Sequence, residues 1–156
     1  MIKKKIYLLI TLISLTLLYN CGYQAIYSDN EKKNIKIKEI KLLGDDKINN
    51  NILSILGINN QINEENELTF ILESSLSDKV TSKNSAGNPL TYQMLLNTRL
   101  IVQKQKKIIN EQNFTSNFTY SNKDNKFDLQ KLREEIEKNL AKTVADKILI
   151  YIKVRL

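Results

Sequence analysis

Residues 90–120 read LTYQMLLNTRLIVQKQKKIINEQNFTSNFTY, and this stretch decides the fold. Between residues 90 and 103 every second side chain belongs to one face, formed by Tyr92, Met94, Leu96, Thr98, Leu100 and Val102. Residues 104–107 are a short polar turn. Residues 108–120 then return, with Phe114, Phe118 and Tyr120 in phase. Two alternating runs joined by four polar residues predict a β-hairpin.

The alternation continues upstream of this hairpin. Residues 68–80 carry Leu68, Phe70 and Leu72 at every second position and predict another strand. Residues 81–88 are polar and are expected to form a connection that ends at Pro89. Residues 35–43 also alternate, with one slip at Lys38 and Glu39, and predict a strand with a β-bulge.

Two segments show helical spacing instead. Asp45 and Asp46 offer an N-cap for a helix over residues 46–57, which Gly57 would end. Its expected apolar face consists of Ile48, Ile52, Ile55 and Leu56. Asp128 is the expected cap of a second helix over residues 128–152. Its stripe consists of Leu129, Leu132, Ile136, Leu140, Val144 and Ile148.

These patterns predict one α+β domain over residues 35–156. Each predicted strand has one apolar face and each helix one apolar stripe, which favours a two-layer sandwich. The expected order is β-α-β-β-β-α, with two helices packed on a four-stranded, mainly antiparallel sheet.

The N-terminus has the pattern of an export signal. Three lysines, Lys3, Lys4 and Lys5, precede an uncharged run over residues 6–19. Fourteen residues are short for a membrane span, which needs about 20. The alternative is a buried N-terminal helix, which the lysines and the missing polar face disfavour. We therefore expect residues 1–20 to be a lipoprotein signal peptide.

Cys21 is the one cysteine of the chain and directly follows this run. Leu18-Tyr19-Asn20-Cys21 resembles a bacterial lipobox, although Tyr19 and Asn20 replace the usual small residues. Lipidation at Cys21 would make residues 21–34 a tether, and two or more acyl chains anchor a protein stably. Gly22 stands where an Asp would indicate inner-membrane retention, so the outer membrane is the expected location. A plain signal peptide with a free thiol is the alternative.

Composition narrows the chemistry. The chain has 24 Lys and Arg, 17 Asp and Glu and no His, for a formal charge of +7. Removal of residues 1–20 leaves 21 basic and 17 acidic residues, an ordinary balance for a surface. Without His, His-dependent triads and Cys/His zinc sites are excluded, and no phosphate-binding glycine loop is recognisable. Acidic residues are adjacent at Asp45-Asp46, Glu64-Glu65 and Glu134-Glu135, but we do not expect a catalytic carboxylate pair, and Glu134-Glu135 is more simply part of a solvated helix face. We expect no catalysis, no cofactor and no metal.

The densest basic cluster of the mature chain is the predicted turn. Lys104, Lys106 and Lys107 belong to it, and Lys79 and Lys83 lie at or near the preceding connection. Such lysines could contact phosphate groups of an anionic glycolipid. The alternative, which we favour, is a lysine-rich turn that keeps a strand end soluble.

A resemblance to a family extends over most of the mature chain. Cys21-Gly22-Tyr23-Gln24-Ala25-Ile26-Tyr27-Ser28 resembles the start of the lipopolysaccharide-assembly lipoproteins (LptE), especially their alphaproteobacterial members. Residues 91–92, 118–120 and 140–148 resemble the hairpin entry, the aromatic strand end and the last helix of that family. The resemblance implies two helices on a four-stranded sheet. It further implies an outer-membrane lipoprotein that plugs a β-barrel translocon (LptD-like), helps it mature and assists lipopolysaccharide insertion.

Two other interpretations stay open at this level. The chain could be an unrelated small periplasmic-facing lipoprotein that acts as a binding module or an envelope scaffold. A binding module predicts a sizeable closed pocket. An enzyme is the third interpretation and the least favoured, because no catalytic constellation is recognisable.

Overall fold

The computed structural model describes residues 37–58 and 62–156. These residues belong to one compact unit, and residues 1–34, the predicted signal and tether, lie outside the described part. The elements follow the order β-α-β-β-β-α. They are β1 (Ile37–Gly44), α2 (Asp46–Leu56), β2 (Leu68–Lys83), β3 (Pro89–Lys104), β4 (Lys107–Ser121) and α3 (Lys126–Arg155).

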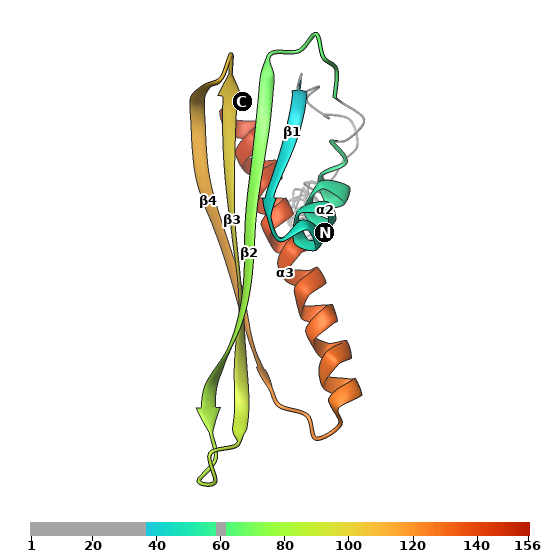
Figure 1. The fold of residues 1–156 in the computed structure, drawn as a ribbon, viewed down its shortest axis with the longest axis vertical. Helices are drawn as coiled ribbons and strands as arrows, with labels where there is room; N and C mark the ends of the chain where they lie inside the picture. Colours follow the sequence, from blue (N-terminus) through green and yellow to red (C-terminus); the bar gives the residue numbers. More distant parts are fainter. Residues whose placement is uncertain (1–36, 59–61) are drawn as a thin grey trace, which may run out of the picture. The chain divides into compact units, whose positions relative to one another are not determined.

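The four strands form one open sheet in the order β1-β2-β3-β4 (Figure 1). β1 pairs with β2 in parallel, and the two later pairs are antiparallel. The predicted mainly antiparallel α+β sandwich is therefore confirmed. The parallel pair follows from the crossover through α2, because a helix between two strands returns the chain in its original direction.

The alternation along β3 places one face of the sheet in the core. Met94, Leu96 and Leu100 are at most 3% exposed, as the hairpin pattern predicts. Thr98 is buried on this face too, and its hydroxyl lies 3.0 Å from that of Ser74 on β2. α2 and α3 pack on this same face and on each other, so the molecule has two layers.

Local signals explain the ends of α2. The Asp45 side chain accepts a hydrogen bond from the Ile48 backbone N–H at 3.0 Å, which is the predicted N-cap. Gly57 is left-handed at φ 63°, as expected for the residue that ends a helix. The predicted bulge in β1 is confirmed by a register shift between Ile37 and Glu39.

Some predicted boundaries were wrong. β2 continues to Lys83, where the sequence predicted a connection, because Ser82 and Lys83 still pair with Thr91 and Pro89. The cap of α3 is Asn125 rather than Asp128, and its side chain accepts from the Phe127 backbone N–H.

Two side chains differ from their predicted burial. Ile55 is 46% exposed, and Leu53 takes its place in the core of α2. Phe118 is in phase with Phe114 but is 52% exposed, because β4 is an edge strand and the helix layer leaves this position open. No helix of the described residues is long and apolar enough to cross a membrane.

Gly44, the last residue of β1, lies at a tightly packed junction between β1 and α2. Its φ is +80°, and a Cβ there would lie 2.2 Å from the Ser74 carbonyl oxygen. That oxygen accepts the Asp45 backbone N–H at 2.9 Å. We expect Gly44→Ala to lower the free energy of unfolding by about 3 kcal/mol or more, since left-handed strain (about 1–2 kcal/mol) adds to a disrupted hydrogen bond (about 1–3 kcal/mol).

The matched control for this prediction is Gly57→Ala, measured in the same urea titration. Gly57 also has a positive φ, but no described atom lies within 4 Å of its added Cβ. Its cost should be the strain alone, about 1–2 kcal/mol. Equal losses at the two positions would contradict the clash at Gly44.

Candidate functional site

The predicted basic residues lie on the turn between β3 and β4. Lys104 and Lys107 are paired across the hairpin, and Gln105 and Lys106 form its two-residue turn with φ of 49° and 65°. Two consecutive left-handed residues are the geometry of a type I′ turn. All three lysines are exposed and lie together at this turn.

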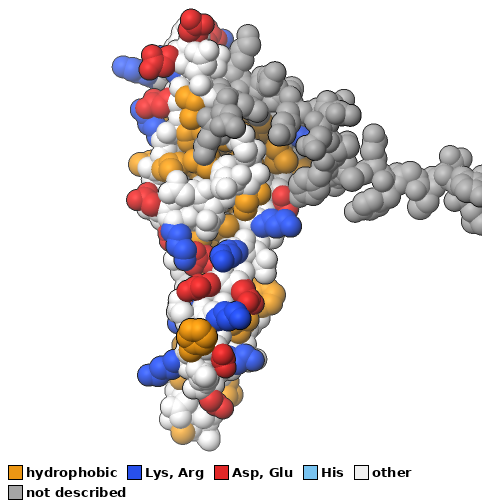
Figure 2. Space-filling view, turned by 90° about the vertical axis from the view of Figure 1, so that its right-hand side faces the viewer, with side chains coloured by type: hydrophobic (Ala, Val, Ile, Leu, Met, Phe, Trp, Pro, Cys, Tyr) orange, Lys and Arg blue, Asp and Glu red, His pale blue; other side chains and the backbone are white. Residues whose placement is uncertain are grey.

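The turn is electrostatically mixed rather than purely basic. Lys104 forms an ion pair with Glu67, with 2.6 Å between Nζ and Oε2. Lys79 and Lys83 lie toward the opposite end of β2 and do not join this cluster, because Lys104 is opposite Leu68. Eleven residues of strand separate Leu68 from Lys79, roughly 36 Å. Interspersed basic and acidic side chains are also visible on the face shown in Figure 2.

A second polar cluster joins the sheet to α3. Asp78, Tyr92 and Tyr120 come from three adjacent strands, and Arg133 comes from the helix. The Arg133 Nε lies 2.9 Å from the Tyr120 hydroxyl and 3.1 Å from Asp78 Oδ2. The Tyr120 hydroxyl donates to the same carboxylate oxygen.

Aromatic contacts complete this Tyr–Asp–Arg cluster. The rings of Tyr92 and Tyr120 stack with centroids 5.5 Å apart, and Arg133 Cζ lies 5.1 Å from the Tyr92 centroid. An arginine over an aromatic face is attracted by the ring quadrupole. The cluster was missed from sequence. The available signal was a charged residue at a position that the hydrophobic pattern assigns to the core. Asp78 lies two residues after Leu76 in the alternation of β2, and Arg133 lies between Leu129 and Ile136 on the apolar stripe of α3.

The opposite face of the sheet carries no described helix. Most of its side chains are polar, and many are short and neutral: Ser75, Ser77, Gln93, Asn97, Asn113, Thr115, Asn117 and Thr119. Toward β1 it also carries apolar side chains, because Ile71 and Ile101 are opposite each other on this face and Ile101 is 7% exposed. Glu73, Arg99 and Glu111 form a row of alternating charge across three strands, with Arg99 between the two carboxylates and 2.9 Å between Arg99 Nε and Glu111 Oε1. The Thr115 hydroxyl donates to Asn97 Oδ1 at 3.0 Å. We call this surface the polar face.

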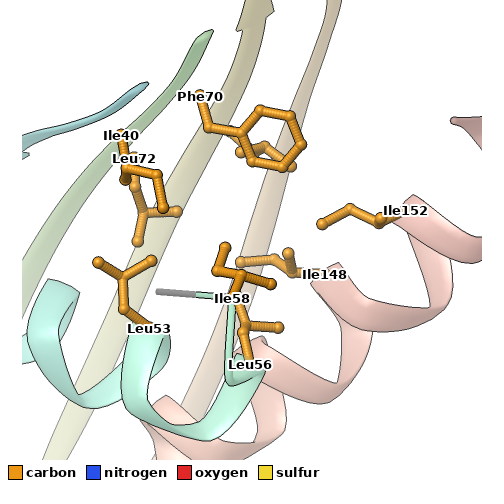
Figure 3. Close-up of a pocket in the computed structure, with 9 residues that line it drawn as sticks. Ile40, Leu53, Leu56, Ile58, Phe70, Leu72, Ile148 and Ile152 are labelled. Atoms are coloured by element: carbon orange, nitrogen blue, oxygen red, sulfur yellow. The ribbon is translucent and has the colours of Figure 1, made fainter. Parts of the chain in front are cut away.

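Between the two layers lies a small apolar cavity (Figure 3). Its volume is about 10 Å³, roughly the minimum for a single water. The lining side chains come from β1, α2, β2, β3 and α3, and include Ile40, Leu53, Phe70, Leu72 and Ile152. This cavity is a packing defect of the core and cannot hold a small-molecule ligand.

The described residues contain no group of three or more Asp, Glu, Cys or His side chains placed to hold a metal ion. What the described surface offers is a mixed-charge turn, the Tyr–Asp–Arg cluster and the polar face. Hydrogen bonding to another surface is the chemistry that such groups support.

The fold is shared with solved bacterial lipoproteins. Rare lipoprotein B of Shewanella oneidensis superposes with a TM-score of 0.57 at 17% identity, over 75% of this chain and 95% of that one. An uncharacterised lipoprotein B of Nitrosomonas europaea gives 0.60 at 12% identity, over 75% and 81%. A minor lipoprotein of Acinetobacter baumannii gives 0.53 at 13% identity, over 76% and 91%.

The similarity to these proteins is found by comparing structures, not by comparing sequences. No protein-family profile matches the chain, and no curated protein matches it. At such low identities the similarity establishes the fold alone.

The Tyr–Asp–Arg cluster predicts a pH dependence. Burial, and then the hydrogen bond to Asp78, raise the pKa of Tyr120 from 10.0 to about 12. Because the folded state favours the protonated phenol, its stabilisation is complete below pH 10 and is lost as the pH rises through about 12.

We therefore expect the free energy of unfolding of the wild type to fall more steeply with rising pH than that of Tyr120→Phe. Urea titrations at several pH values from 9 upward measure both slopes. Parallel slopes for the two proteins would show that Tyr120 carries no such linkage.

Proposed function

We propose that this protein is a lipid-anchored outer-membrane lipoprotein of the LptE type. In this role it plugs the lumen of a large β-barrel translocon (LptD-like), assists its maturation and assists insertion of lipopolysaccharide at the outer surface. The observation that carries the proposal is the two-layer fold with one sheet face uncovered by the described helices and mostly polar along β3 and β4. Barrel interiors are polar, so a lumenal plug needs a hydrogen-bonding surface rather than an apolar one.

The sequence supports the location. A basic segment, an apolar run and Cys21 in lipobox position would place acyl chains at the start of the mature chain. The LptE resemblance and the fold shared with lipoproteins agree with this arrangement.

A direct role of the basic turn in lipopolysaccharide binding has less support. Lys106 and Lys107 are exposed and could contact phosphate groups, but Lys104 is already paired with Glu67. A turn that keeps a strand end soluble accounts for the same residues.

The alternative of an unrelated lipoprotein is weakened in one of its forms. A binding module predicts a sizeable closed pocket, whereas the core cavity described above has about 10 Å³ and the larger hollows of about 470–810 Å³ on the described surface are open to solvent. A scaffold in the envelope remains the competing proposal, and it predicts normal surface lipopolysaccharide after depletion. The proposed plug role involves no catalytic step and no cofactor.

Detergent co-purification tests the proposal. Tagged full-length protein, extracted from outer membranes under mild conditions, should recover a large β-barrel protein in a stoichiometric complex. Depletion of the protein should lower lipopolysaccharide at the cell surface. Recovery of no barrel would rule out the plug role.

Cys21→Ala tests the anchor separately. The variant should lose incorporation of radiolabelled fatty acid and should keep its signal peptide uncleaved. Replacement of Ser28, a neighbouring small polar residue, by Ala is the control and should leave labelling unchanged. Unchanged labelling and fractionation of Cys21→Ala would show that the lipobox prediction is wrong.

A further inference from the structure

The sheet has two edges, and the structure treats them differently. β1 is short and carries Lys38, Glu39 and Lys41 among its eight residues. Its end carbonyls are occupied: that of Ile37 accepts the Asn63 N–H and the Asn66 side chain, and that of Leu43 accepts the Asn49 side chain. Charges and occupied backbone groups protect an edge against pairing with another strand.

β4 lacks this protection over most of its length. It has 15 residues, and the run over residues 112–120 contains no charged residue, no Pro and no Gly. A long uncharged edge strand offers its free backbone groups to an added strand.

The register identifies which backbone groups point outward. The Asn122 N–H donates to the Leu90 carbonyl at 2.8 Å, and the β3–β4 pairing continues from there without a shift to Val102 and Asn110. In an antiparallel pair, hydrogen-bonded and non-bonded residue pairs alternate. The backbone N–H and C=O groups of the even-numbered residues of β4 from 110 to 120 therefore bond to β3. Those of the odd-numbered residues from 111 to 119 point outward, away from β3 and toward the free edge.

Local side chains occupy part of this outward row. Glu111 N–H donates to Asn110, the Asn113 carbonyl accepts from Gln112, and the Thr115 carbonyl accepts Lys147 Nζ at 2.7 Å. Within the described residues, the Thr115 N–H and both backbone groups of Asn117 and Thr119 have no such partner. All three residues are exposed, as is Phe118 between them.

We propose that residues 115–119 of β4 are a docking edge for an extended segment of the barrel partner, which adds a fifth strand to the sheet. The inference rests on the proposed plug function and deepens it by assigning the contact. The added segment would have uncharged polar side chains continuing the polar face and an apolar one beside Phe118.

The positive charge of Lys147 at the β4 edge disfavours a second copy of this chain as the added strand. Lys147 lies over the edge at Thr115 and has no ion pair within the described residues. A foreign segment can place an acidic or neutral residue beside it. A second copy paired edge to edge would bring a second Lys147 to the same edge, and like charges there oppose association.

The test uses Asn117→Pro in the full-length lipidated protein. Because the Asn117 N–H points outward, proline removes no hydrogen bond to β3, and proline is tolerated on the free side of an edge strand. It does remove a donor from the docking edge and obstructs a pairing strand. Asn117→Thr keeps the N–H and is the matched control.

We expect Asn117→Pro to recover about tenfold less barrel in the detergent pull-down, while Asn117→Thr recovers as much as the wild type. A photo-crosslinking amino acid at position 117 should join one extended segment of the barrel partner, identified by mass spectrometry, whereas crosslinks scattered over several barrel strands would indicate contact through the polar face without an added strand. The identity of the crosslinked segment decides the question even if the proline variant folds poorly.

The outcomes separate the two proposals. A wild-type complex with full recovery by Asn117→Pro and no barrel crosslink at position 117 would overturn the docking edge and leave the plug function intact. A crosslink at position 117 to a second copy, or to the protein's own N-terminal segment, would also overturn it. Failure of the wild type to recover any barrel would overturn both.

Discussion

The register of β3 between its two neighbours is the constraint on which the rest of the structure depends. β3 pairs with β2 and with β4 over nearly its whole length. A slip of one residue would turn Leu96, Leu100 and their neighbours out of the core and bring polar side chains under the helices. The buried hydroxyls of Ser74 and Thr98 oppose such a slip, because a polar pair inside an apolar layer is satisfied in one register only.

This register also separates two tasks between the faces of the sheet. The face under α2 and α3 supplies the apolar burial that stabilises the domain. The polar face contributes less of such burial, mainly where Ile101 lies opposite Ile71, and its short hydroxyl and amide side chains bond to one another, as Thr115 does to Asn97. Substitution of such exposed polar side chains changes the free energy of unfolding little. The residues of the polar face and the β4 edge can therefore vary to fit a partner without loss of the fold.

The parts of the fold that are predictable from sequence are those with a long alternating hydrophobic pattern or a local capping signal. The parts that depend on a contact between residues far apart in the chain are not. The alternation along β3 and the cap at Asp45 are local signals, and both predictions are confirmed. The extension of β2 to Lys83 depends on pairing with β3, because its polar residues have no periodic signal of their own. Asp78 and Arg133 meet only after the helix packs on the sheet, so neither residue reveals its partner in sequence. The fate of Cys21 lies outside the described residues.

The connections of the sheet have a consequence for the order in which it forms. Five residues join β2 to β3, and two residues, Gln105 and Lys106, join β3 to β4. Hairpins with such short connections close within about 1–10 μs. β1 instead reaches its parallel position on β2 only after the chain has passed through α2, and such non-local pairing is slower because a longer loop must close first. We therefore expect the three-stranded meander to form before β1 joins it and to provide the surface on which both helices pack.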